Sequence, residues 1–190
     1  MGGSFNPAHE GHLAISREAL KRLDIDQVWW LVAPQNPLKS ATGMAPLRDR
    51  VAGARAIARD RRIKVVAPEA VTGTRFTIDT IAVLQAAYPR HRFVWLMGSD
   101  NLLQLPRWYR WQALLASIPI AIMARPSYDL KAMTGRAAQQ FRKDRLPSRR
   151  GRVIADMTPP GWTFLNFRHR FESSTAIRAE HSARSGASPA

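Results

Sequence analysis

The sequence predicts a single-domain α/β protein, in which a parallel sheet carries helices on both faces. Short apolar runs of strand length alternate with segments of helical periodicity along the 190-residue chain. Nearly continuous apolar strands are typical of sheets that are buried on both faces. A chain of this length encloses one hydrophobic core and is short for two domains.

Four apolar runs have the length and composition of strands. They cover residues Val28–Val32, Ile63–Val66, Phe93–Met97 and Ile118–Met123, and a proline, glycine or polar break follows each. Helical spacing occupies the segments between them. The expected helices carry Ile15, Ala19 and Leu23, or span Leu47–Ala58, Thr77–Tyr88 and Leu130–Phe141, and a last one starts at Ser174. This alternation places ligands at the carboxyl ends of the strands.

Composition excludes several classes of function. The chain has no cysteine, which rules out disulfides, thiolate zinc sites and thiol nucleophiles. No apolar run approaches the ~18 residues that span a bilayer, so we expect no membrane insertion. The amino-terminal residues do not resemble a secretory signal, and we expect a cytoplasmic protein. We expect residues 1–180 to form the domain and the small, polar residues 181–190 to be disordered.

The chain is strongly basic, with 29 Lys+Arg against 14 Asp+Glu and a net charge of +15. This charge suits an acidic partner, whether nucleotide, nucleic acid or anionic lipid, and does not choose among them. The densest basic stretch, Arg142–Arg152, is interrupted by proline and glycine, which favours a solvated loop over a nucleic-acid footprint.

The run GGSFNPAHEGH, Gly2 to His12, has the composition of a phosphate-handling segment. Adjacent glycines let the backbone approach a bulky anion, and His9 and His12 stand about one helical turn apart. Both histidines could instead cap the helix or complete hydrogen bonds in the core. Zinc is disfavoured, because an i, i+3 pair lacks further clustered ligands.

A second segment, SSTAIR, supplies hydroxyls at a helix start and Arg178 in the first turn. Alone, the segment favours an ordinary helix cap with a surface arginine, because helix starts rich in serine and threonine are common. Such phosphate loops normally follow a strand, and only Met1 precedes Gly2 here. We therefore expect an apolar strand upstream of the first motif.

These two motifs, with PLK at residues 37–39, RFTIDT at 75–80, GSDNL at 98–102, RWYRW at 107–111 and ARP at 124–126, form an ordered set. The set resembles the HxGH nucleotidyltransferase superfamily, and bacterial nicotinate mononucleotide adenylyltransferases in particular. The resemblance implies a Rossmann-like, doubly wound sheet. It also implies transfer of AMP from ATP to nicotinate mononucleotide, with Mg2+, giving deamido-NAD and pyrophosphate. The protein would then accelerate the reaction by positioning the substrates and stabilising the charge of the transition state, because a substrate phosphate oxygen is the nucleophile.

The resemblance assigns roles to residues of this chain. His12, with His9 beside it, would stabilise the α-phosphate, and Arg178 would neutralise the departing pyrophosphate. The residues expected to bind ATP are Gly3, Ser4, Phe5, Gly98, Asp100, Ser174 and Thr175. Those expected to bind the acceptor are Lys39, Thr77, Trp108 and Arg125. Asp100 could instead cap the next helix, and Lys39 could be an exposed lysine.

Other functions remain open at this stage. A pantetheine-phosphate adenylyltransferase or a cytidylyltransferase would share the phosphate motifs but not RFTIDT or Trp108. A catalytically silent nucleotide fold that uses the positive charge to bind nucleic acid is a further alternative. No reading helix or basic stripe interleaved with aromatic residues supports it, so we expect no nucleic-acid partner. The residues leave open the choice between nicotinate and nicotinamide mononucleotide, and the oligomeric state.

Overall fold

The computed structural model describes residues 1–35, 43–125 and 128–166. Its strands are β1 Gly2–Gly3, β2 Val28–Val32, β3 Ile63–Val66, β4 Trp95–Gly98, β5 Ile120–Met123, β6 Arg145–Leu146 and β7 Trp162–Leu165. Its α-helices are α1 Glu10–Arg22, α2 Leu47–Ile57, α3 Pro68–Thr72, α4 Thr77–Ala87, α5 Ser99–Gln104, α6 Trp111–Ser117, α7 Asp129–Thr134 and α8 Arg136–Gln140. The short 3-10 helices are η1 Leu105–Arg107, η2 Arg142–Asp144 and η3 Ser148–Asp156.

All strand pairs are parallel, as expected. They form two sheets, in the orders β1-β2-β3 and β4-β5-β7-β6. The chain runs from β3 through α3 and α4 before it enters β4, so the second sheet starts a new half of the fold. Within the described residues, β1 pairs with β2 alone, and β4 pairs with β5 alone.

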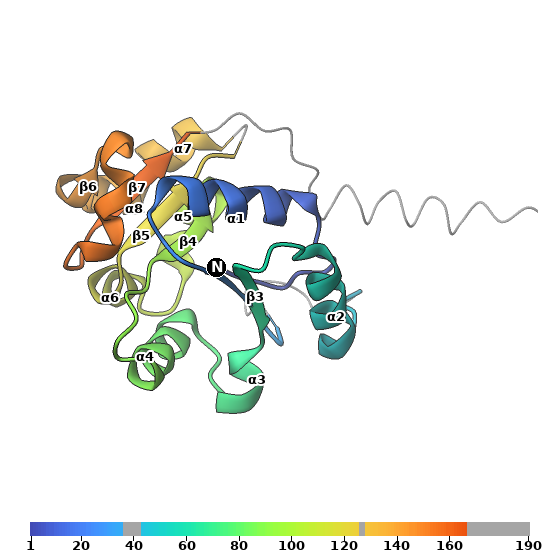
Figure 1. Ribbon diagram of the computed structural model, residues 1–190. Coiled ribbons are helices and arrows are strands. Elements are labelled where there is room, and N and C mark those ends of the chain that lie inside the picture. The colour runs from blue at the N-terminus through green and yellow to red at the C-terminus, as the bar shows by residue number, and fades with distance from the viewer. Residues whose placement is uncertain (36–42, 126–127, 167–190) are drawn as a thin grey trace, which may run out of the picture.

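Helices cover both faces of the strands, which confirms the doubly wound architecture (Figure 1). On one face α1 and η3 pack against Trp30, Leu96 and Ala121. On the other face α4 to α8 pack against residues such as Met97 and Ile122. Because neighbouring residues of a strand point to opposite faces, a strand between two helical layers must be apolar throughout. All four residues of β5 are buried for this reason.

The sequence located four strands and the helices α1, α2 and α4, with errors at the boundaries. β4 begins at Trp95 and not at Phe93, and β5 begins at Ile120 and not at Ile118. The single helix expected over Leu130–Phe141 is wrong, because the chain breaks at Gly135 into α7 and α8. β6, β7, α3, α5 and α6 were not expected; each is short, and periodicity is a weak signal over so few residues.

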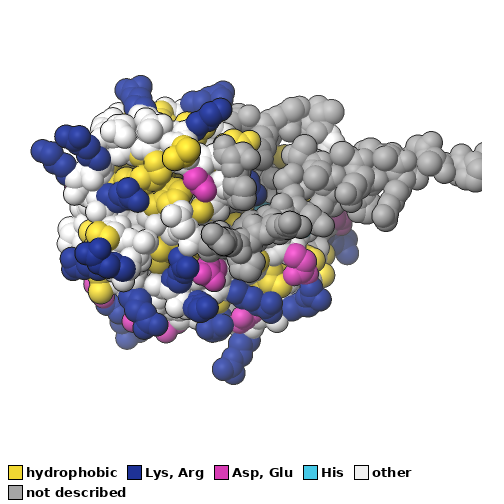
Figure 2. Space-filling model, turned by 90° about the horizontal axis from the view of Figure 1, so that it is seen from above, with side chains coloured by type: hydrophobic (Ala, Val, Ile, Leu, Met, Phe, Trp, Pro, Cys, Tyr) yellow, Lys and Arg dark blue, Asp and Glu magenta, His cyan; other side chains and the backbone are white. Residues whose placement is uncertain are grey.

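The basic stretch Arg142–Arg152 is not the plain loop that we expected. It contains η2, the short strand β6 that pairs with β7, and the start of η3. Leu146 and Gly151 are buried, while most of its charged side chains are exposed. Lysine and arginine side chains are dispersed over the face shown in Figure 2, without a continuous stripe. In the part of the chain that the structure describes, no helix is long and apolar enough to cross a membrane.

Candidate nucleotide site

The amino-terminal motif forms a short strand, a loop and the start of a helix. β1 pairs with the end of β2, and the chain then turns through residues 4–9 into α1. His9 is the N-cap of α1, and its Nδ1 accepts the backbone N–H of Gly11 at 3.1 Å. His12 reaches back, and its Nδ1 accepts the N–H of His9 at 3.2 Å. The two imidazoles thus form a capping box, with ring centroids 4.0 Å apart.

The capping box fixes the tautomer that each ring has when it is neutral. A ring nitrogen that accepts a hydrogen bond cannot also carry a proton, so the proton of each neutral ring lies on Nε2. His9 is 5% exposed, and its Nε2 is buried without a partner among the described residues. Burial, and secondarily the positive charge of Arg125, lowers the pKa of His9 to about 4. At neutral pH, His9 is therefore a neutral imidazole with a free Nε2–H donor.

Aromatic packing holds the second histidine in place. Phe5 is 2% exposed and stacks on Trp30 with a centroid separation of 5.2 Å. The ring of His12 lies 4.8 Å from Phe5 and 5.9 Å from Trp30. Phe5 has a φ of 46°, in the left-handed region that bulky residues rarely adopt. Phe5 was expected only among the residues that bind ATP. Its side chain also packs against His12, which the sequence motif did not indicate.

A buried arginine that we did not predict holds the same loop. Arg50, on α2, is 4% exposed. Its guanidinium donates to the carbonyl oxygens of Ser4 at 2.7 Å, Ala33 at 2.7 Å, Pro34 at 2.8 Å and Ala45 at 2.9 Å. Burial lowers its pKa. Four carbonyl acceptors from three chain segments converge on one planar group, a geometry that five fixed N–H donors can satisfy.

Gly98, the last residue of β4, lies together with Asp100 and Arg125, which follow the ends of β4 and β5. Arg125 Nη1 donates to Asp100 Oδ2 at 2.9 Å. A Cβ at Gly98 would lie 2.4 Å from Asp100 Oδ1, so only glycine fits there without displacing the carboxylate. Asp100 Oδ1 is buried and has no hydrogen-bond partner within the described ranges. Asp100 makes no cap on α5, which leaves this oxygen available to a ligand donor.

Two further side chains that we did not predict position Arg125. Ser99 Oγ donates to Asp129 Oδ1 at 2.8 Å, and the backbone N–H of Arg125 contacts both groups, at 2.9 Å and 2.8 Å. The arginine is held from two sides, by these backbone contacts and by Asp100. Ser99 and Asp129 are the first residues of α5 and α7, and no sequence motif paired residues thirty positions apart.

The expected acceptor residues Thr77 and Trp108 lie on two segments that contact each other. Thr77 is the first residue of α4, and Trp108 follows η1. Phe76 stacks on Tyr109 with centroids 4.4 Å apart, which brings the two segments together. Trp108 is half-buried against the core. The ion pair joins Arg125 to Asp100, and the charge of Arg125 acts on His9, whereas the stack of Phe76 on Tyr109 joins the segments that carry Thr77 and Trp108. Lys39, Ser174, Thr175 and Arg178 lie outside the described residues.

A glycine loop that leads into a histidine-capped helix, at the carboxyl edge of a doubly wound parallel sheet, defines an α/β nucleotide-binding domain. A family model described as cytidylyltransferase-like matches residues 1–180. The chain is 49% identical to a probable nicotinate-nucleotide adenylyltransferase of Parvibaculum lavamentivorans, over 94% of this chain and 89% of the relative. It is 48% identical to one of Gluconobacter oxydans, over 94% and 91%.

The fold also resembles a solved structure. A Plasmodium falciparum nicotinic acid mononucleotide adenylyltransferase, complexed with NaAD, aligns with a TM-score of 0.70 at 16% identity, over 94% of this chain and 80% of that one. The chain therefore belongs to the cytidylyltransferase-like family and, within it, to the nicotinate-nucleotide adenylyltransferases.

Proposed function

We propose that this protein transfers AMP from ATP to nicotinate mononucleotide, giving deamido-NAD and pyrophosphate. The family assignment supports the reaction, and one structural observation supports the site: His9 and His12 cap α1 through Nδ1, and the buried Nε2 of His9 has no partner among the described residues. A phosphate oxygen of the mononucleotide attacks the α-phosphorus of ATP. The bond from that phosphorus to the bridging oxygen breaks, and pyrophosphate leaves with the electron pair.

His12 and His9 would act as hydrogen-bond donors to the α-phosphate. Negative charge builds on its non-bridging oxygens during transfer, and donors already fixed in place stabilise that charge without reorganisation. No general base is required, because the attacking phosphate oxygen is already deprotonated at neutral pH. The loop backbone of Gly3, Ser4 and Phe5, which Arg50 holds, would line the phosphates.

Asp100 and Gly98 would receive the adenosine. The free Oδ1 of Asp100 can accept a ribose hydroxyl, and the absent side chain at Gly98 leaves room for close approach. Arg125 pairs with this carboxylate, and its positive charge would act on the bound nucleotide; the same charge adds to the larger effect of burial in keeping His9 neutral. Arg125, which follows β5 of the second sheet, remains our candidate for contact with the substrate.

We assign the remaining roles as the sequence motifs suggest. Trp108 would stack on the pyridine ring, and amides at Thr77 would bind the nicotinate carboxylate. Lys39 would hold a substrate phosphate. Ser174 and Thr175 would bind the outer phosphates, and Arg178 the departing pyrophosphate. Mg2+ would enter as part of the MgATP substrate; the described residues contain no group of three His, Cys, Asp or Glu that could hold a metal by itself.

The test is a direct assay with ATP and MgCl2 and, in separate reactions, nicotinate or nicotinamide mononucleotide. Dinucleotide and pyrophosphate should appear in equal amounts, and faster with the nicotinate substrate. A parallel assay with pantetheine phosphate separates the nearest alternative. Formation of no dinucleotide from either mononucleotide, by a protein shown to be folded and to bind ATP, would refute the assignment.

A further inference from the structure

The short helix α3 has no apolar anchor. None of its five residues, Pro68–Thr72, is buried, and Val71 is 89% exposed. The chain then turns at Gly73, whose φ of 68° lies in the left-handed region, before it enters α4. Apolar packing therefore does not fix the position of α3 and of the turn that follows it. Polar contacts must do so.

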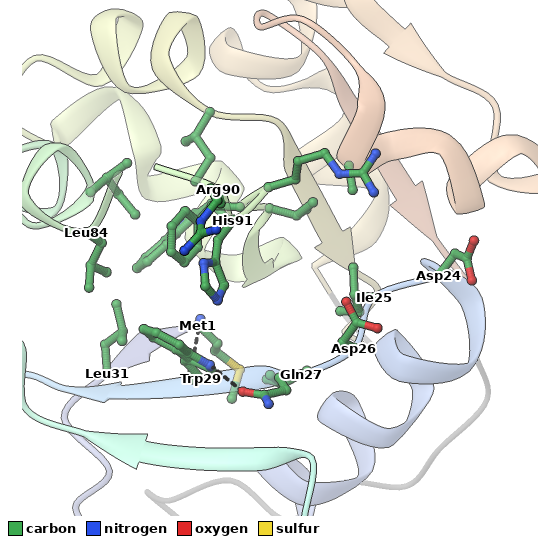
Figure 3. A pocket seen from close by; sticks show the side chains of 18 residues that line it. Met1, Asp24, Ile25, Asp26, Gln27, Trp29, Leu31, Leu84, Arg90 and His91 are labelled. Carbon is green, nitrogen blue, oxygen red and sulfur yellow. Dashed lines mark hydrogen bonds between the residues drawn. The ribbon is translucent and has the colours of Figure 1, made fainter. Parts of the chain in front are cut away.

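Helix α4, by contrast, is held by its apolar face. Ile81 and Leu84 are buried in the core. Figure 3 shows Leu84 at the same end of a cavity as Leu31, which belongs to β2. Thr80 directly precedes Ile81 on this helix and is 2% exposed. A contact with the side chain of Thr80 is therefore a contact with a fixed point of the fold.

The hydroxyl of Thr80 joins α4 to α3 and to the turn between them. Thr80 Oγ1 donates to Glu69 Oε1 at 3.3 Å and lies 3.0 Å from Oγ1 of Thr74. Oγ1 of Thr74 lies in turn 3.0 Å from Oγ1 of Thr72, the last residue of α3. Side-chain oxygens from α3, the turn and α4 thus form one connected chain, which ends on the carboxylate of Glu69.

The same hydroxyl contacts the peptide group that begins α4. The carbonyl oxygen of Phe76 accepts from Thr80 Oγ1 at 3.3 Å, and from the backbone N–H groups of Asp79 at 3.0 Å and Thr80 at 3.1 Å. The one hydroxyl proton of Thr80 is thus shared between Phe76 and Glu69. Because the peptide from Phe76 to Thr77 is trans, its N–H points away from these donors. The N–H of Thr77 is therefore directed out of the start of the helix.

We propose that Glu69 is a positioning residue for recognition of the carboxylate on the pyridine ring. The inference rests on the proposed function, in which the amide of Thr77 binds that carboxylate. Glu69 holds the hydroxyl of Thr80 and the turn in one arrangement, and thereby fixes the direction of the Thr77 N–H.

The surroundings of Glu69 agree with this role. Burial raises the pKa of Glu69, and the hydrogen bond from Thr80 opposes that shift. The contact with Thr80 therefore stabilises the ionised carboxylate, which accepts hydrogen bonds and donates none. In that form Glu69 can only be the end of the hydroxyl chain, so the chain has one direction.

An N–H of fixed direction discriminates between the two mononucleotides. The carboxylate of the nicotinate form accepts through either oxygen, and its charge strengthens the bond. The carboxamide of the nicotinamide form accepts through one oxygen, and its NH2 group, turned toward the same N–H, would bring two donors together. A loosened Thr77 amide loses more with the stronger acceptor. Glu69 therefore contributes to the preference for nicotinate mononucleotide that the proposed function expects.

The experiment compares Glu69→Ala, Glu69→Gln and Thr80→Val with the unchanged protein. Glutamine keeps an acceptor oxygen without the charge, and valine replaces the Thr80 hydroxyl with a methyl group. Val71→Ala is the matched control, because Val71 is exposed on the same helix as Glu69. Measurements are kcat and KM for ATP and for each mononucleotide, and backbone amide exchange of segment 73–77 in the free protein.

Glu69→Ala and Thr80→Val should each raise the KM for nicotinate mononucleotide roughly three- to tenfold, the equivalent of one hydrogen bond. The KM for ATP should not change. The ratio of kcat/KM for the nicotinate substrate to that for the nicotinamide substrate should fall by a similar factor. Amide exchange of segment 73–77 should be faster in both variants. Glu69→Gln should recover most of these properties, and Val71→Ala should match the unchanged protein.

Unchanged amide exchange in Glu69→Ala and Thr80→Val would overturn the proposal. So would faster exchange without a change in the ratio of the two kcat/KM values. An equal rise of KM for ATP and for both mononucleotides would leave Glu69 with a role in stability alone and would also overturn it. These three results require an active unchanged protein. If the unchanged protein forms no dinucleotide, the proposed function fails, and this inference fails with it.

Discussion

Arg50 Nη1 donates to the carbonyl oxygen of Ser4 over 2.7 Å, which fastens the loop after β1 to helix α2. The same guanidinium binds Ala33 and Pro34 just beyond β2. A buried guanidinium on another element therefore anchors this loop. In the hydrogen bonds that the structure gives for it, every acceptor is a backbone carbonyl oxygen. Loss of this cation leaves several buried acceptors without donors.

We expect Arg50→Met to lower the free energy of unfolding by about 3 kcal/mol or more and to reduce kcat. Arg50→Lys should recover only part of the stability, because an ammonium cannot reach carbonyls that a planar fork reaches together. Arg48→Met is the matched control, since Arg48 is exposed on the same helix. Denaturant unfolding and steady-state rates would be measured for all three. Wild-type behaviour of Arg50→Met would contradict the role of the loop anchor.

The two functions of His9 can be separated by substitution. Asparagine at position 9 keeps an acceptor for the helix cap but removes the Nε2–H donor, whereas alanine removes both. We expect both variants to lose activity, and only His9→Ala to lose the ~1 kcal/mol of a helix cap as well. His12→Ala should lower kcat roughly 10²- to 10³-fold. Melting curves and rates with saturating substrates would be compared. A fully active His9→Asn would show that the cap is the whole function of His9.

The depressed pKa of His9 makes stability depend on pH. The folded pKa is about 4, against an ordinary value of 6.5, so the unfolded chain binds a proton between these values that the folded protein does not. The free energy of unfolding should therefore decrease as the pH falls from 6.5 to 4, by about 3 kcal/mol. Urea titrations at several pH values would measure it. His9→Asn should remove this part of the pH dependence; an unchanged slope in that variant would assign it to other groups.

The carboxylate of Asp100 should leave no room for a side chain at position 98. An added Cβ would lie 2.4 Å from Asp100 Oδ1, so Gly98→Ala should cost about 1–3 kcal/mol of stability and raise the KM for ATP. The control is Gly53→Ala on helix α2, where no atom lies within 4 Å of the added Cβ and a gain of about 0.5–1 kcal/mol is expected. Combining Gly98→Ala with Asp100→Ala should restore part of the stability. Equal effects of the two glycine substitutions would contradict the steric argument.

The sequence by itself determined the alternation of strands and helices, because burial between two helical layers makes strands such as β5 apolar at every position. It also identified the first motif, although only together with the other motifs that follow it in order along the chain, because the glycines and histidines alone are a weak signal. The position of Val28–Val32 and of Ile63–Val66 followed directly from these patterns. Asn6 donates to the carbonyl oxygen of Gly43 and accepts from the backbone N–H of Ala45, a turn-stabilising use that an amide side chain allows.

Only the tertiary structure decided which distant groups meet. Arg50 is forty-six positions from Ser4, and Ser99 is thirty from Asp129, so no local pattern could pair them. The break at Gly135 and the short strands β6 and β7 depend on neighbours and not on periodicity. The same holds for the free Nε2 of His9, because a ring nitrogen becomes a donor to a ligand only when the fold has occupied the other one.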